Sequence, residues 1–367
     1  MTPVASDLRE KVATAPGPFH HLGDTILVFR GAADEVRLQT WMPNFPTPPP
    51  FQSMSHDLHY LRLPLPATAR IEYRFLIRNG RRQIAIEDPL NPPIATNPFG
   101  VNSVVAGPGY RPPWFVRGRA FGEGTLTEIR VHSTGLGGRR HHRIYLPAGV
   151  ASKDARTVLL VHDGFDFLQH GGLGPALDQL TQKEVIPPTA AVLLEPRDRI
   201  LEYGASLAHS RHLAEEVLPH LARRLRIWSP LDRTVALGSS LGGVAALAAA
   251  AHYPKVIGAV VSLSGSFAHR SDHFWPASVF KPVITFLDAF DPRLLSGVRM
   301  YQSVGRYEGL VDFNRRLHPR LVAGGIRVKW VETWTGHDWG AWLDRLEEAL
   351  TFVLPPASPP SGGRNGN

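Results

Sequence analysis

A serine in a glycine-rich turn is the residue with the clearest potential for chemistry. Residues 238–242 read Gly-Ser-Ser-Leu-Gly, which matches G-x-S-x-G; an apolar run precedes them and an alanine-rich run follows. A strand, a sharp turn and a helix in that order raise the hydroxyl of the central serine above the end of a sheet. The start of the helix offers a backbone N–H, that of Leu241, to an oxyanion. This context predicts that Ser240 is a nucleophile rather than part of an ordinary strand-to-helix bend.

A serine hydroxyl needs a general base, and the chain has 17 histidines from which to choose. His337 directly follows a strand-like run near the end of the chain, in the sequence Gly-His-Asp-Trp. In this arrangement the order along the chain is serine, then acid, then histidine. His337 is therefore the predicted base. Its neighbour Asp338 is poorly placed to orient the same imidazole, so a packing or turn role is expected for it.

The acid that orients the histidine should follow a strand between the serine and the histidine. Glu308 comes after the strand-like run 298–305 and a turn at Gly305, and Asp312 lies one helical turn further on. The acid would fix the tautomer of His337 and stabilise the imidazolium that forms during the reaction. Glu308 is the favoured acid, and Asp312 is the alternative.

A second donor to the oxyanion normally comes from an earlier strand-to-helix loop. The apolar run 158–161 leads into His162, Asp163, Gly164 and Phe165. We expect the backbone N–H of Gly164 or Phe165 to be that donor. His162 is expected to be structural rather than catalytic.

The elements that would position these residues alternate between strands and helices over residues 116–355. Several of the strand-like runs are nearly continuous in valine and leucine, as expected where helices cover both faces of a sheet. This part of the chain is therefore predicted to be an α/β domain. Its expected strands are 129–133, 142–147, 156–163, 190–196, 234–240, 259–265, 298–305 and 327–334.

The preceding residues, 21–115, are strand-like with short polar breaks. Around residues 71–78, apolar and charged side chains alternate with a period of two, which indicates a half-buried strand, and Asn79-Gly80 fits a tight hairpin. These features predict a small all-β, immunoglobulin-like sandwich, with the proline-rich stretch 108–115 as its boundary. Residues 1–20 are expected to be flexible and residues 356–367 disordered.

Composition limits the classes of function. The 367 residues carry a formal net charge of +8, no cysteine and no long apolar run, which disfavours disulfides, thiolate metal sites and a membrane span. No motif supports nucleic-acid binding, whereas an arginine-rich protein suits anionic small molecules. The first residues lack the pattern of a secretory signal, so a cytoplasmic location is expected.

Taken together, these motifs resemble the enterochelin (ferric enterobactin) esterase family, within the esterase D group of α/β hydrolases. The similarity covers nearly the whole chain and is carried by "HDGFDFL", "GSSLGG", "GRYEGLVDFNRRL", "GHDWGAW" and, in the first domain, "YRFLIRNG" and "EDPLNPP". The family implies an α/β-hydrolase domain preceded by a β-sandwich. It also implies a triad of Ser240, Glu308 and His337.

The resemblance points to a second group of residues near the expected substrate pocket. Arg199 and Glu202 match the start of a family helix, where Ser206 and His209 replace the usual asparagine and aromatic residue. Arg199, Glu202 and His209 are therefore candidate substrate contacts. Arg306 is a further candidate, because an arginine suits an anionic substrate. The aromatic and basic segment 264–292 is expected either to cap the pocket or to pack on itself at the surface.

The function implied by the resemblance is hydrolysis of a catecholate trilactone siderophore, with release of its iron. No cofactor or protein metal site is expected, because iron would arrive with the substrate. One alternative is an esterase acting on feruloyl or acetyl esters of carbohydrates, and another is a non-catalytic binding protein. The sequence leaves open the preference for ferric or iron-free substrate, the oligomeric state and whether the first domain contacts substrate.

Overall fold

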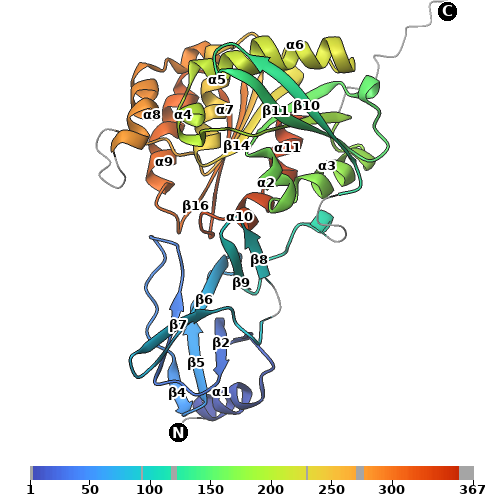
Figure 1. Ribbon diagram of the computed structural model, residues 1–367. Helices are drawn as coiled ribbons and strands as arrows, with labels where there is room; N and C mark the ends of the chain where they lie inside the picture. Colours follow the sequence, from blue (N-terminus) through green and yellow to red (C-terminus); the bar gives the residue numbers. More distant parts are fainter. Residues whose placement is uncertain (1–2, 92–93, 117–121, 229, 270–276, 355–367) are drawn as a thin grey trace, which may run out of the picture. The chain divides into compact units, whose positions relative to one another are not determined.

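The computed structural model describes the chain except for residues 1–2, 92–93, 117–121, 229, 270–276 and 355–367 (Figure 1). The chain divides into two compact units. The first comprises Met1–Pro112 with two later segments, Gly305–Gly309 and Glu332–Ala341, and the second comprises Pro113–Val304, Leu310–Val331 and Trp342–Asn367. The sequence predicts a boundary near residue 115 but not the return of two later segments to the first unit. The tail predicted to be disordered, residues 356–367, lies outside the described residues.

The first unit is built on two antiparallel sheets, which confirms the predicted all-β domain. Its apolar core is formed by side chains of both sheets, including Leu27 and Phe29 of one and Ile71, Tyr73 and Phe75 of the other. One sheet has the order β1 (Phe19–His21), β2 (Asp24–Arg30), β5 (Leu58–Leu63), β4 (Gln52–Ser55); the other has β3 (Glu35–Gln39), β6 (Arg70–Asn79), β9 (Gly100–Ala106), β8 (Ile94–Asn97), with β7 (Arg82–Ile86) also paired to β6.

Strand β6 confirms the predicted hairpin and corrects the predicted pattern of exposure. Asn79 pairs with Arg82 of β7, and Gly80 in the turn has φ +59°, a conformation that favours glycine. The alternation of apolar and charged residues predicts that Glu72 lies on the exposed face of the strand, yet its carboxylate is buried. It is buried because Arg70 and Asn102 provide it with hydrogen bonds.

The N-terminal segment expected to be flexible contains a helix instead, α1 (Pro3–Thr14). Leu8 and Val12, four residues apart, are buried with Ile26 and Val28 of β2. Arg30 of β2 also donates to the carbonyl oxygens of Val12, Ala13 and Ala15 at the end of the helix. The helix was not predicted because its buried apolar stripe is narrow.

The second unit contains an eight-stranded sheet, and each of the eight strands predicted for this domain is present in it. Strands β13, β12, β14, β15 and β16 run parallel, and β10 and β11 add an antiparallel edge. The strands, in sheet order, are β10 (Thr125–Ser133), β11 (Gly138–Leu146), β13 (Thr189–Leu194), β12 (Thr157–His162), β14 (Thr234–Ser239), β15 (Ala259–Leu263), β16 (Arg299–Gly305) and β17 (Arg327–Thr333).

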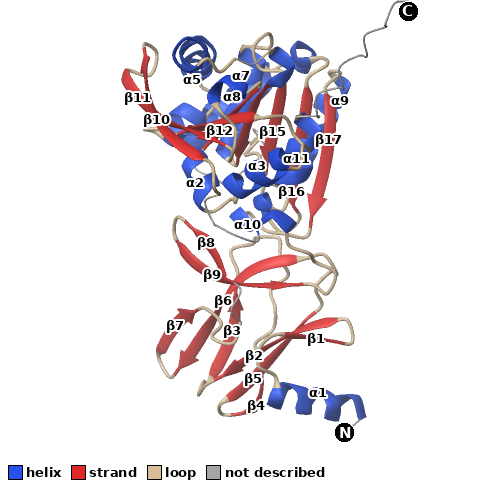
Figure 2. Cartoon of the chain, turned by 90° about the vertical axis from the view of Figure 1, so that its right-hand side faces the viewer, coloured by secondary structure: helices blue, strands red, loops and turns tan. Residues whose placement is uncertain are grey.

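Helices cover both faces of this sheet, which confirms the predicted α/β-hydrolase architecture (Figure 2). Side chains of α7, α8 and α9 share one large core with the sheet, while α3 and α11 contact each other on the opposite face. No helix in the described ranges is long and apolar enough to cross a membrane. The helices are α2 (Gly164–Gln169), α3 (Leu173–Gln182), α4 (Arg199–Tyr203), α5 (Leu207–Arg211), α6 (Leu218–His220), α7 (Leu241–His252), α8 (Ala277–Ala289), α9 (Val311–Ala323), α10 (Trp339–Leu343) and α11 (Leu346–Val353).

The junction between β14 and α7 requires glycine for steric reasons. A Cβ atom at Gly238 would lie 2.3 Å from the backbone carbon and oxygen of Gly242. Both neighbours are backbone atoms, so no side chain can move to relieve this contact. The small residues of the motif therefore set how closely the helix approaches the strand.

Replacing Gly238 by alanine should lower the free energy of unfolding by about 3 kcal/mol, the upper part of the usual range for overpacking. Urea denaturation of the purified variants measures the loss. Gly297→Ala is the matched control: Gly297 has φ +84° and nothing within 4 Å of an added Cβ, so it should cost only about 1 kcal/mol. Equal losses in the two variants would contradict the steric explanation.

Candidate active site

Ser240 occupies a strained turn between strand β14 and helix α7. Its backbone has φ +55° and ψ −124°, a conformation rarely adopted by residues with side chains. Three hydrogen bonds hold it: its N–H donates to Leu263 O at 3.0 Å, and its carbonyl accepts from Gly243 N at 3.1 Å and Ser266 N at 3.0 Å. The Oγ atoms of Ser240 and Ser266 are 3.1 Å apart. The turn thus has the geometry predicted for a nucleophile at a strand end.

The loop after β12 lies beside this turn and ends in the start of a helix. Asp163 has a left-handed backbone, and α2 begins at the next residue, Gly164. A Cβ atom at Gly164 would be 2.3 Å from Leu193 Cα, and one at Gly242 would be 3.1 Å from His162 Cβ. The first N–H groups of a helix have no partner within that helix. The predicted donors Gly164 and Phe165 are the first residues of α2, and Leu241 is the first residue of α7. These two helices follow the neighbouring strands β12 and β14.

Arg199 and Tyr203 hold Asp163 in this conformation. The guanidinium of Arg199 donates to both carboxylate oxygens of Asp163 at 2.7–3.0 Å, and the Tyr203 hydroxyl accepts from Asp163 N at 3.0 Å. Arg199 was predicted as a substrate contact. In the structure its guanidinium is committed to the loop that carries the predicted oxyanion donors.

Glu308 and His337 form a hydrogen-bonded pair in the first unit. Glu308 is fully buried, and its Oε2 lies 2.5 Å from His337 Nδ1 while its Oε1 accepts from Gly305 N at 2.5 Å. A carboxylate can only accept, so Nδ1 carries the proton and Nε2 is left as the basic nitrogen. The alternative acid, Asp312, has a side chain 72% exposed and paired with Arg315 at 3.4 Å.

The structure brings the predicted residues together in two groups. Ser240, Leu241, Gly164 and Phe165 belong to the second unit, whereas Glu308 and His337 belong to the first. Within the described residues no group of three histidine, cysteine, aspartate or glutamate side chains is arranged to hold a metal ion.

The other predicted substrate contacts make hydrogen bonds or ion pairs with residues of the protein itself. Glu202 is buried and accepts two hydrogen bonds from Arg140, a partner that lies 62 residues away and that no local pattern indicates. Arg306 pairs with Glu332 at 3.1 Å and lies over the ring of Trp334. His209 is 3% exposed. Arg306 is partly exposed, but the side chains of Glu202 and His209 face the protein interior.

His209 belongs to a set of buried histidines joined in pairs. Its Nε2 is 3.0 Å from Nε2 of His162, and Nε2 of His142 is 2.9 Å from Nε2 of His212. His162 Nδ1 donates to Leu237 O and His212 Nδ1 to Glu216, so His209 and His142 are the donors within their pairs. His162 is thus buried and hydrogen-bonded on both ring nitrogens, as expected for the structural role predicted for it.

Burial lowers the pKa of each of these four histidines. The pKa of His142 falls to about 3, because neighbouring positive charge adds to the effect of burial. The pKa of His162 falls to about 4, although its hydrogen bond to Leu237 and the charge of Asp163 oppose the effect of burial. Those of His209 and His212 are lowered as well, again mainly by burial. All four imidazoles are therefore neutral in the folded protein at neutral pH.

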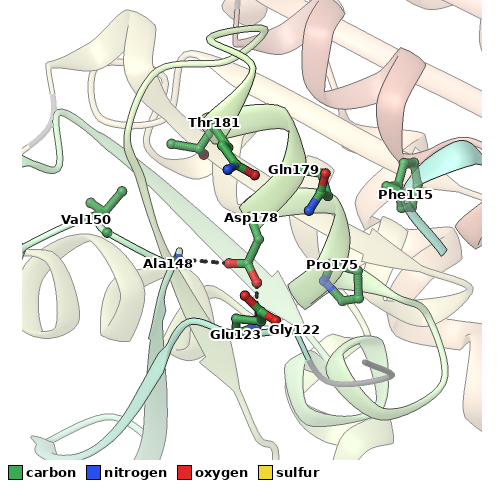
Figure 3. A pocket seen from close by; sticks show the side chains of 11 residues that line it. Phe115, Gly122, Glu123, Ala148, Val150, Pro175, Asp178, Gln179 and Thr181 are labelled. Atoms are coloured by element: carbon green, nitrogen blue, oxygen red, sulfur yellow. Dashed lines mark hydrogen bonds between the residues drawn. The ribbon is translucent and has the colours of Figure 1, made fainter. Parts of the chain in front are cut away.

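A separate pocket of about 520 Å³ lies in the second unit and contains none of the predicted site residues (Figure 3). Asp178 lines this pocket, but its carboxylate accepts hydrogen bonds from Glu123 N, Ala148 N and the Tyr145 hydroxyl. These partners commit the carboxylate to holding the loops together rather than to binding a ligand.

The fold and the turn at Ser240 define an α/β hydrolase. Residues 133–353 match the family model described as "Putative esterase", so the chain belongs to the esterase family. Among curated relatives, the iron(III) enterobactin esterase of Dickeya dadantii is 29% identical over 65% of this chain and 57% of its own length. An iron(III) enterobactin esterase of Escherichia coli is 27% identical over 77% of this chain and 72% of its own length. The match thus spans little more than half of the Dickeya protein.

Solved structures agree on the fold. An enterobactin esterase from Shigella flexneri, solved in the presence of enterobactin, has a TM-score of 0.73 at 22% identity and covers 96% of this chain and 99% of its own. A ferric enterobactin esterase from Salmonella typhimurium reaches 0.76 at 21% identity, covering 94% and 98%. The solved structures show a shared fold, and together with the sequence relatives they confirm the resemblance to the enterochelin esterases.

Acid should destabilise the protein through the buried histidines. An unfolded histidine has a pKa near 6.5, so below that pH the unfolded chain binds protons that the folded chain does not. The stabilising contribution of these histidines is therefore fully present above about pH 6.5. As the pH drops below that value, the free energy of unfolding should fall by about 1.4 kcal/mol per pH unit for each such histidine. Thermal unfolding between pH 7.5 and 5.5 measures this slope.

The double variant His142→Gln/His212→Gln should flatten the slope, because glutamine does not titrate. His132→Gln removes an exposed histidine of the same unit and is the matched control. The explanation is wrong if the double variant loses as much stability between the two pH values as the unmodified protein does.

Proposed function

We propose that this protein is a serine esterase that hydrolyses the ester bonds of a catecholate trilactone siderophore and so releases its iron. Ser240, in a strained turn at the start of a helix, is the observation that supports a serine mechanism most directly. The substrate class is supported by relatives named as esterases of iron(III) enterobactin and iron(III) salmochelin. Opening the trilactone would break the scaffold that holds the catecholates around the metal.

The proposed chemistry is a two-step acyl transfer. His337 Nε2 accepts the proton of the Ser240 hydroxyl as Oγ attacks the ester carbonyl, and the N–H groups of Leu241 and of Gly164 or Phe165 stabilise the oxyanion. The tetrahedral intermediate collapses to an acyl-enzyme, and the leaving alkoxide takes the proton from His337. Water, deprotonated by His337, then releases the acid and restores Ser240.

Charge favours the proposed substrate. A ferric tris-catecholate is a polyanion, and a protein with a formal net charge of +8 attracts it at long range. The iron is cargo bound by the substrate, so the proposal requires no metal ligand from the protein.

Ser240→Ala should abolish turnover of the siderophore, with a loss of about 10⁵- to 10⁶-fold in kcat, because the nucleophile is removed. The assay compares both proteins on four substrates: a ferric catecholate trilactone, its iron-free form, a feruloyl sugar ester and an aryl acetate.

The four substrates separate the possible failures. Ser240-dependent cleavage of the feruloyl ester or aryl acetate without cleavage of either trilactone would keep the serine mechanism and refute the siderophore assignment. Unchanged turnover in Ser240→Ala would refute the serine mechanism itself.

Glu308→Gln should lower kcat by about 10³- to 10⁴-fold, because glutamine can turn its NH₂ group toward His337 and favour the wrong tautomer. Asp312→Asn is the matched control: it neutralises an exposed carboxylate four residues away and should leave kcat within about twofold, as expected for a surface substitution. The reverse ranking would identify Asp312 as the acid.

A further inference from the structure

The segments that carry Glu308 and His337 are held by side chains of the N-terminal sandwich. Both segments, Gly305–Gly309 and Glu332–Ala341, belong to the first unit, and Tyr307 and Trp334 enter its apolar core. This observation raises the question of what the sandwich contributes to the reaction.

Arg70 of strand β6 holds the segment around His337. Its side chain is 8% exposed, and Nη1 donates to Asp338 Oδ1 at 2.7 Å. The same oxygen accepts from Ala341 N at 2.8 Å, and Arg70 N donates to Trp334 O at 3.1 Å. Arg70 thus ties down the chain on both sides of His337.

Two features make this contact specific for an arginine. A Cβ atom at residue 340 would lie 2.1 Å from Arg70 Nη2, so Gly340 leaves the space that the guanidinium fills. Glu72 Oε1 lies 3.3 Å from Nη2 on the same guanidinium. The fork of Arg70 therefore reaches two carboxylates at once, which the single ammonium of lysine does not reproduce.

The shared guanidinium binds Asp338 more strongly than Glu72. Burial and the negative charge of Asp338 raise the pKa of Glu72 to about 7. The contact of Arg70 to Asp338 is 2.7 Å, shorter than its 3.3 Å contact to Glu72.

Asn44 makes the corresponding contacts to the acid segment. Its Nδ2 donates to Glu308 O at 2.8 Å, and its N–H donates to Tyr307 O at 3.0 Å. Phe45 packs edge-on against Tyr307, with ring centroids 4.9 Å apart. Two separate parts of the sandwich thus fix the backbones of both members of the Glu308–His337 pair.

We infer that the sandwich acts in catalysis through Arg70 and Asn44, which are positioning residues for the Glu308–His337 pair. The inference rests on the proposed function. Arg70 orients the base through Asp338, the residue next to His337, and Asn44 orients the acid through its backbone. Neither residue needs to contact substrate, so the sandwich sets the turnover rate rather than the affinity for the ester.

The test uses the full chain with Arg70→Met, Asp338→Asn and Asn44→Ala. Each should lower kcat by about 10- to 100-fold with KM changed less than about twofold, because small displacements of a reacting group are costly. Asp338→Asn and Asn44→Ala carry the test if Arg70→Met fails to fold. The double variant Arg70→Met/Asp338→Asn should be no slower than Arg70→Met, since both changes remove the same ion pair between residues 70 and 338.

Tyr73→Phe is the matched control for general damage to the sandwich. Tyr73 lies on the same strand, and its buried hydroxyl donates to Asp88 and accepts from Asn91, away from both segments. Tyr73→Phe should lower the melting temperature as much as the test variants do, while leaving kcat within about twofold. An equal fall of kcat in this control, or unchanged kcat in all three test variants, would overturn the inference.

A second readout does not depend on turnover. The Nδ1 proton of His337, in its 2.5 Å hydrogen bond to Glu308, should give a downfield ¹H NMR resonance that is absent from His337→Gln. Arg70→Met and Asn44→Ala should move this resonance upfield, and Tyr73→Phe should leave it in place. A resonance that stays in place in Arg70→Met and Asn44→Ala would refute the positioning role, whereas Ser240-independent turnover would refute only the proposed function.

Discussion

The strained backbone at Ser240 is the constraint on which the second unit depends. A residue with a side chain keeps φ +55° only if its surroundings hold it there. Here the restraint comes from β15 through Leu263, from α7 through Gly243 and from the segment after β15 through Ser266. The parallel sheet fixes the positions of those partners. The order and register of its strands therefore hold Ser240 in a backbone conformation of high free energy.

The same principle governs the loop after β12. Asp163 is left-handed without being glycine, and it is held by Arg199 and Tyr203 rather than by the sheet. Tyr203 in turn packs on His162, whose pair with His209 fills the space behind the loop. A series of buried polar contacts therefore supports the amides at the start of α2.

A structural feature can be predicted from the sequence when the residues that determine it are close together in the chain. The eight strands of the second unit follow from apolar runs, and the turn at Ser240 follows from a short motif, so both are confirmed in the structure. Helix α1 escaped prediction because its buried stripe contains few residues, among them Leu8 and Val12. The burial of Glu72 also escaped, because its partner Asn102 is 30 residues away in the sequence and only the fold brings them together.

The predicted substrate contacts show the same limit. Arg199, Glu202 and His209 were predicted because they occupy the places of a helix entry in the resembled family, and the structure shows that each also has a partner inside the fold. Conversely, nothing in the local sequence marks Asn44 or Arg70, since their partners lie more than 260 residues later in the chain. A local motif identifies a nucleophile because its geometry is local. The residues that we propose to orient the acid and the base are brought to them by tertiary contacts, which come from the N-terminal sandwich.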